Sequence, residues 1–394
     1  MPHSSVITVL QRIEDTGGHA TGFDYLRVIL AIGIVCWHSI ATSYGSYADI
    51  KISSSMYRPL MAIILPMFFS LSGFLVAGSL ERSKTLFMFM SLRVIRIFPA
   101  LCVEVLLSAL VLGPILTQMT LQDYFSNTMF WHYFLNCTGD IHYVLPGVFS
   151  DNPYPYAVNA QLWTVPWELK CYISIALLTI IGAVRYRLML LVSIICLIGA
   201  AAVYYSVVYP DYFFGNPKGS IAGCFLVVSF LLGVAMYLYS DKIIWDGRIA
   251  LLACFVSLVL FSVRCGDVLV TIPVAYMTVY AGLLNPYKFG IMKGADYSYG
   301  VFLYGFPLQQ AFVSLLEWTP TWWLNILVCV PLAFVVAAFS WHFVEKPALS
   351  LKKKLVALEA LWIRACNRYF SWSWLPHWLH SSSSHGLASP EYRQ

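Results

Sequence analysis

The sequence is poor in charged residues. Asp, Glu, Lys and Arg make up 11% of its 394 residues, whereas an ordinary soluble domain carries roughly 25%. Hydrophobic residues reach 59%, and the mean hydropathy is +0.72. This composition excludes a disordered chain. It also argues strongly against a water-soluble globule, because so much apolar surface would leave large exposed patches.

The sequence also lacks the motifs of several common sites. It has no CxxC pair and no HExxH or HxxxH pattern, so we expect no metal site. It has no Walker or GxGxxG phosphate loop and no GxSxG nucleophile motif. The formal net charge of +5 is small for this length, and no zinc-finger spacing or basic-aromatic groove predicts binding of nucleic acid. The N-terminal residues do not have the pattern of a signal peptide.

Long apolar runs dominate what is present. A membrane helix needs about 20 mostly apolar residues, and ten candidate segments approach that length. They are residues 23–44, 58–80, 97–116, 160–183, 187–208, 220–240, 248–263, 267–285, 296–316 and 321–343. The sequence therefore predicts an all-α, polytopic integral membrane bundle of about ten transmembrane helices, with a membrane domain over residues 23–347.

Lys and Arg are distributed unevenly between the connections. If the N-terminus is placed in the cytoplasm, the outer connections carry only Lys51, Arg58, Lys218 and Arg264. The longest outer connection, residues 117–159, has no Lys or Arg at all. Because positive charge favours the inner side, we predict that both termini are cytoplasmic.

The segments outside the bundle have their own patterns. Residues 1–22 are predicted to be a cytoplasmic N-terminal segment. The outer loop 117–159 is aromatic and contains proline, which is typical either of a functional loop or of an aromatic belt at the bilayer surface. The tail 348–394 begins with a basic amphipathic segment that we expect on the anionic inner leaflet, and its Ser-rich end, 380–394, is predicted to be disordered.

The first apolar segment contains two ionisable residues, Arg27 and His38. Such residues are costly inside a bilayer, so each is a candidate for a functional role. They are eleven residues apart, which places both on one helix face, about 16 Å apart along the axis. The pair suits a substrate that reaches from one compartment to the other. The alternative is that His38 is a hydrogen-bonded core residue.

Two further groups of residues suggest chemistry near the inner side. Arg93 and Arg96 are an i,i+3 pair, expected at the cytoplasmic entry of the third helix, where two guanidinium groups could bind phosphates. Ordinary positive-inside anchoring would also explain them. Ser72, followed by a glycine in the second helix, either contacts substrate or only allows close helix packing.

The fourth predicted helix contributes a carboxylate and a pair of tryptophans. We expect Glu168 at a depth similar to that of His38, where a carboxylate can orient an imidazole. Trp163 and Trp167 are four residues apart and could form a platform for a sugar ring, or they could be interfacial anchors.

Four motifs, taken in order, resemble those of the membrane acyltransferase-3 family. They are Gly22-Phe23-Asp24-Tyr25-Leu26-Arg27 with His38 after ten intervening residues, Phe68-Phe69-Ser70-Leu71-Ser72-Gly73-Phe74-Leu75, Arg93-x-x-Arg96-Ile97-x-Pro99, and Leu162-Trp163-Thr164 through Glu168. Two weaker matches follow at Ser298-Tyr299-Gly300-Val301-Phe302-Leu303 and Glu345-Lys346-Pro347. One such motif would be weak, but this ordered set is specific and spans nearly the whole membrane domain.

The resemblance implies a ten-helix bundle that moves an acyl group, usually acetyl, onto a sugar hydroxyl. The donor would be cytoplasmic acyl-CoA, such as acetyl-CoA, and no tightly bound cofactor is expected. The acceptor would be a surface polysaccharide or a lipid-linked glycan, and the location a bacterial inner membrane. The matched motifs assign His38 as the catalytic residue and place Arg27, Arg93 and Arg96 in donor binding or its support.

One departure from the family pattern concerns the segment after Ser298. Many members have a histidine just after the corresponding motif, whereas Tyr304-Gly305-Phe306-Pro307 stands there in this chain. Tyr304 is therefore a candidate to replace that histidine.

The combined hypothesis is that His38 acts as general base or forms an acyl intermediate, oriented by Glu168. Ser72, Trp163 and Tyr304 are candidate substrate contacts. The alternatives are a transporter or flippase of glycan precursors, which would explain the intramembrane charges as a substrate path, and a scaffold without chemistry.

Overall fold

The computed structural model describes residues 7–83, 85–216, 219–290, 294–316 and 321–369. Over these ranges the regular secondary structure is helical, apart from three isolated β-bridges. The helices before the outer loop are α1 (Val9–Asp15), α2 (Gly22–Ser53), α3 (Arg58–Ala62), α4 (Ile64–Arg82), α5 (Leu86–Leu107), η1 (Ser108–Leu112) and α6 (Gly113–Leu116). The outer loop holds α7 (Leu121–Ser126), α8 (Thr128–Tyr133) and η2 (Phe134–Thr138).

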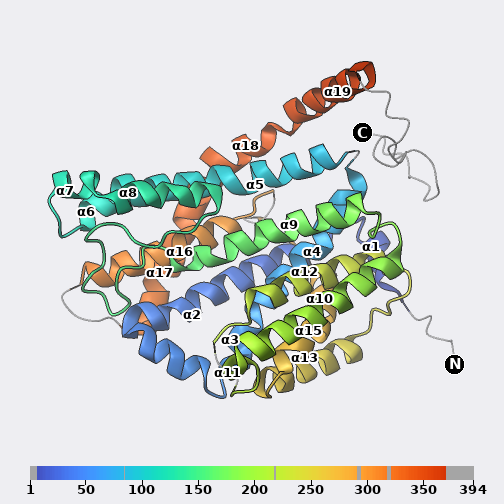
Figure 1. Ribbon diagram of the computed structural model, residues 1–394, viewed down its shortest axis with the longest axis horizontal. Helices are drawn as coiled ribbons and strands as arrows, with labels where there is room; N and C mark the ends of the chain where they lie inside the picture. Colours follow the sequence, from blue (N-terminus) through green and yellow to red (C-terminus); the bar gives the residue numbers. More distant parts are fainter. Residues whose placement is uncertain (1–6, 84, 217–218, 291–293, 317–320, 370–394) are drawn as a thin grey trace.

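The second half of the chain continues in the same way (Figure 1). Its helices are η3 (Ala160–Thr164), α9 (Val165–Ile180), α10 (Arg187–Val208), α11 (Pro210–Phe213), α12 (Gly223–Leu238), α13 (Gly247–Ser262), α14 (Gly266–Leu269), α15 (Thr271–Gly282), α16 (Ser298–Ser314), α17 (Trp322–Ser340), η5 (Trp341–Glu345), α18 (Lys346–Ser350) and α19 (Lys352–Tyr369). In Figure 1, α1 lies at the right-hand end of the molecule, and α7 and α8 lie at the left-hand end.

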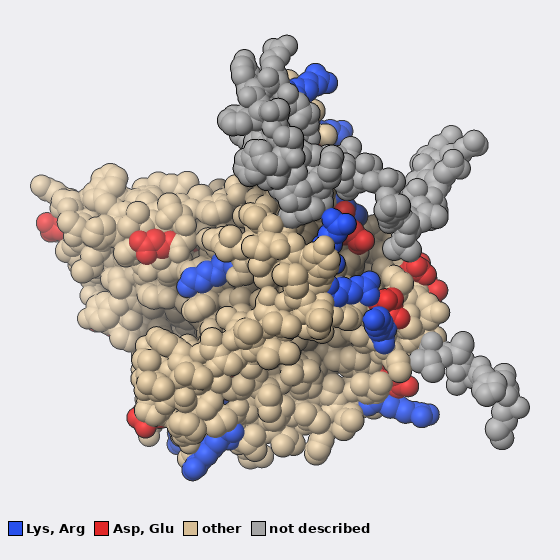
Figure 2. Space-filling view, turned by 45° about the vertical axis from the view of Figure 1, so that its right-hand side comes forward, with Lys and Arg blue, Asp and Glu red and all other residues tan. Residues whose placement is uncertain are grey.

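Helical structure occupies each of the ten predicted segments, so the all-α class is confirmed. Five helical stretches are long and apolar enough to cross a membrane: Gly22–Ser53, Arg58–Arg82, Leu86–Leu116, Arg187–Val208 and Trp322–Leu361. Two shorter apolar helices, α12 and α13, accompany them. These helices are those of an integral membrane protein, while the number of spans and their orientation stay predictions. Figure 2 shows one face of the molecule, mostly tan, with the visible charged residues gathered largely toward the right of the view.

Three helix boundaries differ from those predicted. Helix α5 begins at Leu86 rather than near residue 97, because the Thr85 side chain caps it by accepting a hydrogen bond from the Met88 backbone N–H. Helix α2 runs on to Ser53 past a kink at Gly45, where φ is 85°. The predicted fourth helix begins with the 3₁₀ turn η3, and its α-helical part starts only at Val165.

Helices α4 and α12 contact each other closely through a glycine on each side. A Cβ atom on Gly73 would lie 1.9 Å from the Phe230 carbonyl oxygen, and one on Gly233 would lie 2.0 Å from the Ser70 carbonyl oxygen. The Ser70 hydroxyl donates a hydrogen bond of 3.1 Å to the Ser229 carbonyl oxygen across the same contact. The small residues of the second apolar segment therefore let two backbones touch, which explains Gly73 by packing alone.

The outer loop is fixed to the bundle by buried amide side chains. Asn159 donates hydrogen bonds to Glu104 on α5 (3.0 Å) and to the Leu303 carbonyl oxygen on α16 (2.9 Å). Gln310 on α16 donates to the carbonyl oxygens of Tyr154 (2.7 Å) and Ala157 (2.8 Å). The loop is thus an ordered wall at one end of the molecule, which decides the shape of the cavity described below.

Both ends of the described chain pack against the bundle. The Val9 N–H donates to the Ile243 carbonyl oxygen (2.9 Å), and the Arg12 guanidinium lies 4.7 Å from the centre of the Trp245 ring. Helix α19 is the predicted amphipathic segment, and it is tied to the start of α5 by a hydrogen bond from Thr85 to Glu359. Its contact with the inner leaflet stays a prediction, and the predicted disorder of residues 380–394 lies outside the described residues.

Candidate functional site

Two adjoining cavities bring together residues from most of the sequence motifs. An outer cavity of about 960 Å³ is lined by His38, the outer loop and the start of α12. An inner cavity of about 100 Å³ is lined by Arg27, Arg93, Arg96 and Glu168. Four residues line both cavities: Ile34, Leu65, Thr164 and Phe302. The two cavities therefore lie side by side and share a wall within the bundle.

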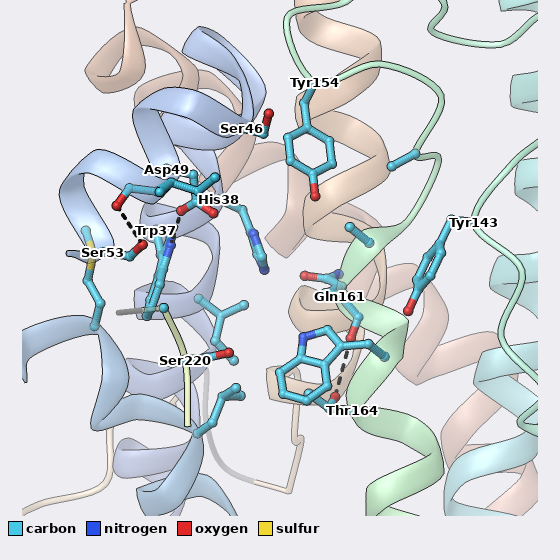
Figure 3. A pocket seen from close by; sticks show the side chains of 18 of the residues that line it. Trp37, His38, Ser46, Asp49, Ser53, Tyr143, Tyr154, Gln161, Thr164 and Ser220 are labelled. Atoms are coloured by element: carbon cyan, nitrogen blue, oxygen red, sulfur yellow. Dashed lines mark hydrogen bonds between the residues drawn. The ribbon is translucent and has the colours of Figure 1, made fainter. Parts of the chain in front are cut away.

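His38 projects from α2 into the outer cavity (Figure 3). Its imidazole packs edge-on against the Phe306 ring, with centroids 5.1 Å apart and planes at 84°. Within the described part of the chain, no hydrogen bond holds either ring nitrogen. The arrangement is thus not that of a hydrogen-bonded core histidine, and a ring nitrogen is available to a ligand in the cavity.

The kink at Gly45 turns the end of α2 back toward the cavity. A Cβ atom at this position would lie 2.6 Å from the Pro153 carbonyl oxygen, so the kink is packed directly against the outer loop. Beyond it, Asp49 lines the cavity and accepts a hydrogen bond of 2.7 Å from the Trp37 indole N–H. Sequence reasoning missed Asp49 because it ended the helix at residue 44.

The opposite wall of the outer cavity comes from the outer loop and η3. Tyr143, Tyr154 and Gln161 lie on this wall in Figure 3, and Trp163 lines the same cavity. The aromatic composition of residues 117–159 was the sequence signal for the two tyrosines. Trp163 is a candidate substrate contact predicted from the sequence. No motif had indicated that Gln161 would line the cavity.

Two of the three arginines at the inner cavity share one carboxylate. Arg27 on α2 and Arg96 on α5 lie 2.7 Å and 2.5 Å from Asp296, which precedes α16. The Ser298 hydroxyl also donates to Asp296 (2.5 Å), and Arg96 lies 3.6 Å from Glu345 of η5. Both weaker motifs of the sequence, around Ser298 and Glu345, therefore meet the stronger ones at this cluster.

Asp296 is held in its charged form by this cluster. Burial alone would raise the pKa of its carboxyl, but the charges of Arg96 and Arg27 and the hydrogen bonds from Ser298 outweigh burial and lower the pKa below its usual range. Arg27 and Arg96 are thus each ion-paired within the protein.

Arg93 differs from the other two arginines. It donates a hydrogen bond of 2.5 Å to the Ser79 hydroxyl, and its guanidinium carbon lies 5.4 Å and 5.9 Å from the ring centres of Phe89 and Tyr172. Its Nε atom is buried without a hydrogen-bond partner, and no carboxylate among the described residues forms an ion pair with it. Arg93 is therefore the guanidinium most available to an anionic ligand.

Glu168 lines the inner cavity and not the outer one that holds His38, so the structure does not bring the two predicted partners into contact. The Glu168 carboxylate accepts a hydrogen bond of 2.5 Å from the Tyr172 hydroxyl and lines the inner cavity with the arginines. No hydrogen bond joins it to His38 in the described ranges.

The remaining predicted substrate contacts divide between the two cavities and the core. Ser72 lines the inner cavity and Trp163 the outer one. Trp167 is not on the same platform as Trp163, because it packs against Gly223 and lies 3.9 Å from the Lys170 Nζ atom. Tyr304 lines neither cavity; it is buried, with its hydroxyl 3.5 Å from that of Ser340.

The chain is similar to known proteins over most of its length. The family model described as an acyltransferase domain matches residues 21–344. Nodulation protein 10 of Rhizobium leguminosarum bv. viciae is 27% identical over 369 residues, which cover 87% of this chain and 97% of that protein. An O-acetyl transferase of Shigella phage Sf6 is 27% identical over 367 residues, which cover 86% of this chain and 98% of that protein. No solved structure gives a significant match.

Proposed function

This chain belongs to that acyltransferase family, and from this premise we propose that it moves an acetyl group from cytoplasmic acetyl-CoA to a hydroxyl of a polysaccharide or lipid-linked glycan in a bacterial inner membrane. The named activity of the phage relative, O-acetyl transfer, supports the choice of acetyl and of a hydroxyl acceptor. The family assignment makes the chain an enzyme, which argues against the two alternatives, a transporter without acyl transfer and a scaffold without chemistry.

The observation that carries the proposal is the pair of adjoining cavities. One holds an imidazole that makes no hydrogen bond to any described residue, and the other holds three guanidinium groups. A donor with phosphates at one end and a thioester at the other fits this separation, because Arg27 and His38 are about 16 Å apart along α2. The phosphates bind at Arg93, and the pantetheine arm extends past Arg27 to His38.

His38 then acts as the general base. Its free ring nitrogen takes the proton of the acceptor hydroxyl while the hydroxyl oxygen attacks the thioester carbonyl carbon. The carbon–sulfur bond breaks, and the CoA thiolate leaves and takes up the proton from the imidazolium. General base catalysis of this kind increases the reaction rate about 10²–10⁴-fold. Since Glu168 lies in the inner cavity, it shapes the donor site instead of orienting the imidazole.

The proposal is tested by acetyl transfer in membranes that contain this protein. Labelled acetyl-CoA is added, and label is measured in the host's own polysaccharide and lipid-linked glycans. His38→Ala should lower the labelled glycan about 100-fold or more, because the base is lost. His19→Ala, at an exposed position before α2, is the matched control and should transfer like the wild type.

Two results would contradict the proposal. One is a His38→Ala variant that transfers at the wild-type rate. The other is the absence of labelled glycan with acetyl-CoA and with succinyl-CoA, in a host whose glycans are known to carry such esters.

A further inference from the structure

Gln161 has an unusual environment in the outer cavity. The residue is 1% exposed and belongs to η3, between the outer loop and α9. Neither its Oε1 nor its Nε2 atom has a hydrogen-bond partner in the described part of the chain. Because a buried amide is costly when its polar atoms are unpaired, this side chain requires an explanation.

The other buried amides near the cavity are at least partly satisfied. Gln310 donates to two carbonyl oxygens of the outer loop, and Asn159 donates to Glu104 and Leu303. Gln309, on the neighbouring position of α16, donates to the Val35 carbonyl oxygen (2.9 Å). Among the buried Asn and Gln side chains that the structure describes, only Gln161 lacks partners at both amide atoms.

The position of Gln161 indicates where its partner belongs. Its side chain lines the outer cavity, and in Figure 3 its amide points across the cavity toward the His38 imidazole. A ligand within reach of this amide would therefore also be within reach of the proposed general base.

The two unpaired atoms also indicate what kind of ligand binds. The amide offers one acceptor and one donor group side by side. A thioester carbonyl only accepts hydrogen bonds, so it would leave Oε1 unpaired. Two neighbouring hydroxyls of a sugar ring both donate and accept, and they satisfy both atoms. Trp37, Trp163 and Tyr154 add aromatic faces around the same space, as an apolar sugar face requires.

We propose that Gln161 positions the acceptor, by hydrogen bonding through both amide atoms to two neighbouring hydroxyls of a sugar ring and so presenting an adjacent hydroxyl to His38. This inference rests on the proposed function, because it assumes that the outer cavity holds the acceptor. It adds that the enzyme selects sugars with two free adjacent hydroxyls beside the acylated position.

The test uses membranes that contain the full-length protein, labelled acetyl-CoA and the host's glycan pool. Two products are measured: labelled glycan, and free acetate whose release depends on His38, where water replaces the sugar hydroxyl. Gln161→Leu has nearly the same shape but neither polar group. It should lower the ratio of glycan label to acetate release about tenfold or more, while acetate release stays within about threefold of wild type.

Two further variants complete the experiment. Gln309→Leu removes an equally buried amide that lines neither cavity, so its product ratio should equal that of the wild type. Should Gln161→Leu be lost from the membrane, Gln161→Glu keeps the shape and one acceptor atom but removes the donor group, and the same fall in the ratio is expected.

Each outcome has a defined meaning. An unchanged ratio in Gln161→Leu or Gln161→Glu overturns the inference. An equal fall in glycan label and acetate release also overturns it, because the amide would then serve the thioester carbonyl. If the wild type gives neither product, the proposed function itself has failed, which is distinct from a failure at Gln161 alone.

Discussion

Arg93 is the arginine for which the structure makes the sharpest prediction. Arg27 and Arg96 are both ion-paired with Asp296, whereas Arg93 lies against a serine hydroxyl and two aromatic rings and has no carboxylate ion pair among the described residues. A guanidinium without a carboxylate partner keeps its full attraction for phosphate. The three arginines that the resemblance assigned to donor binding therefore differ in structure: two are ion-paired with Asp296, and Arg93 is not.

Replacing Arg93 should weaken donor binding selectively. We expect Arg93→Ala to raise the KM for acetyl-CoA about 10- to 100-fold, since one charge-assisted contact to phosphate contributes about 1.5–3 kcal/mol. Acetyl-pantetheine, which lacks the nucleotide phosphates, should be used equally well by the variant and the wild type. A similar loss with both donors would show that Arg93 does not contact phosphate.

At the residue scale, regular helical spacing was the most informative pattern in the sequence. Arg27 and His38 lie on one uninterrupted stretch of α2, and each reaches a different one of two adjoining cavities, as the separation along the helix predicts. The predicted contact between Glu168 and His38 is not formed in the structure, where Glu168 accepts a hydrogen bond from Tyr172 and lines the other cavity. Gln161 could not have been identified at all, since its unpaired state is visible only in the packed structure.

At the scale of elements, the contact between α4 and α12 does not tolerate larger side chains at its two glycines. Two backbones meet there with glycine on each side, and neither position has room for a methyl group. A methyl group at Gly73 or Gly233 would force the two helices apart. It would also shift the face of α4 on which Ser72 lines the inner cavity.

Gly73→Ala should therefore destabilise the protein. We expect a loss of about 1–3 kcal/mol from overpacking, measured as a lower thermal unfolding temperature of the detergent-solubilised protein. Gly199→Ala is the matched control, because nothing lies within 4 Å of its Cβ position in α10. That variant should unfold at the wild-type temperature or slightly above it. Equal behaviour of the two variants would contradict the role assigned to the contact.

Element boundaries were the least predictable part of the fold. Hydropathy located helical structure in all ten segments because the apolar runs are long, but it could not detect the cap at Thr85 or the continuation of α2 past Gly45. Arg93 and Arg96 consequently lie well inside α5 and not at its entry. The kink matters for function, because Asp49 reaches the outer cavity through it.

At the scale of the whole molecule, Asp296 links segments that are far apart in the sequence. It pairs with Arg27 near the start of the bundle and with Arg96 on α5, while Arg96 also lies beside Glu345 near its end. Residues from motifs at both ends of the range 22–347 are thus brought into one cluster of charged side chains. The resemblance assigned Arg27 and Arg96 to one role, but only the structure identifies Asp296, which belongs to none of the motifs, as their shared partner.

Removing the Asp296 charge should destabilise the whole bundle. Asp296→Asn leaves two guanidinium groups without their common carboxylate, and we expect a loss of about 3 kcal/mol in the free energy of unfolding. The pH dependence has a defined sign, because the pKa of Asp296 is lowered on folding. Its contribution is fully present above the unfolded pKa of about 4 and is lost as pH falls through the lower folded pKa.

The measurement is a series of thermal unfolding curves between pH 7 and pH 3. The wild type should lose stability toward the acid end of the series, and Asp296→Asn should lack that part of the loss. Ser298→Ala, which removes one hydrogen bond and no charge, should have a smaller effect at every pH. If Asp296→Asn were as stable as the wild type at pH 7, the role assigned to the cluster would be contradicted.

The difference in size between the two cavities has a consequence for the membrane itself. An enzyme that meets one substrate on each side of a bilayer risks becoming an ion leak, and a membrane potential of 100 mV drives each elementary charge with about 2.3 kcal/mol. The outer space measures about 960 Å³ but the inner one only about 100 Å³. Under the proposed function, this narrow inner space, bordered by the guanidinium groups of Arg27, Arg93 and Arg96, would repel cations and so would limit ion leakage while the acyl group crosses the bundle.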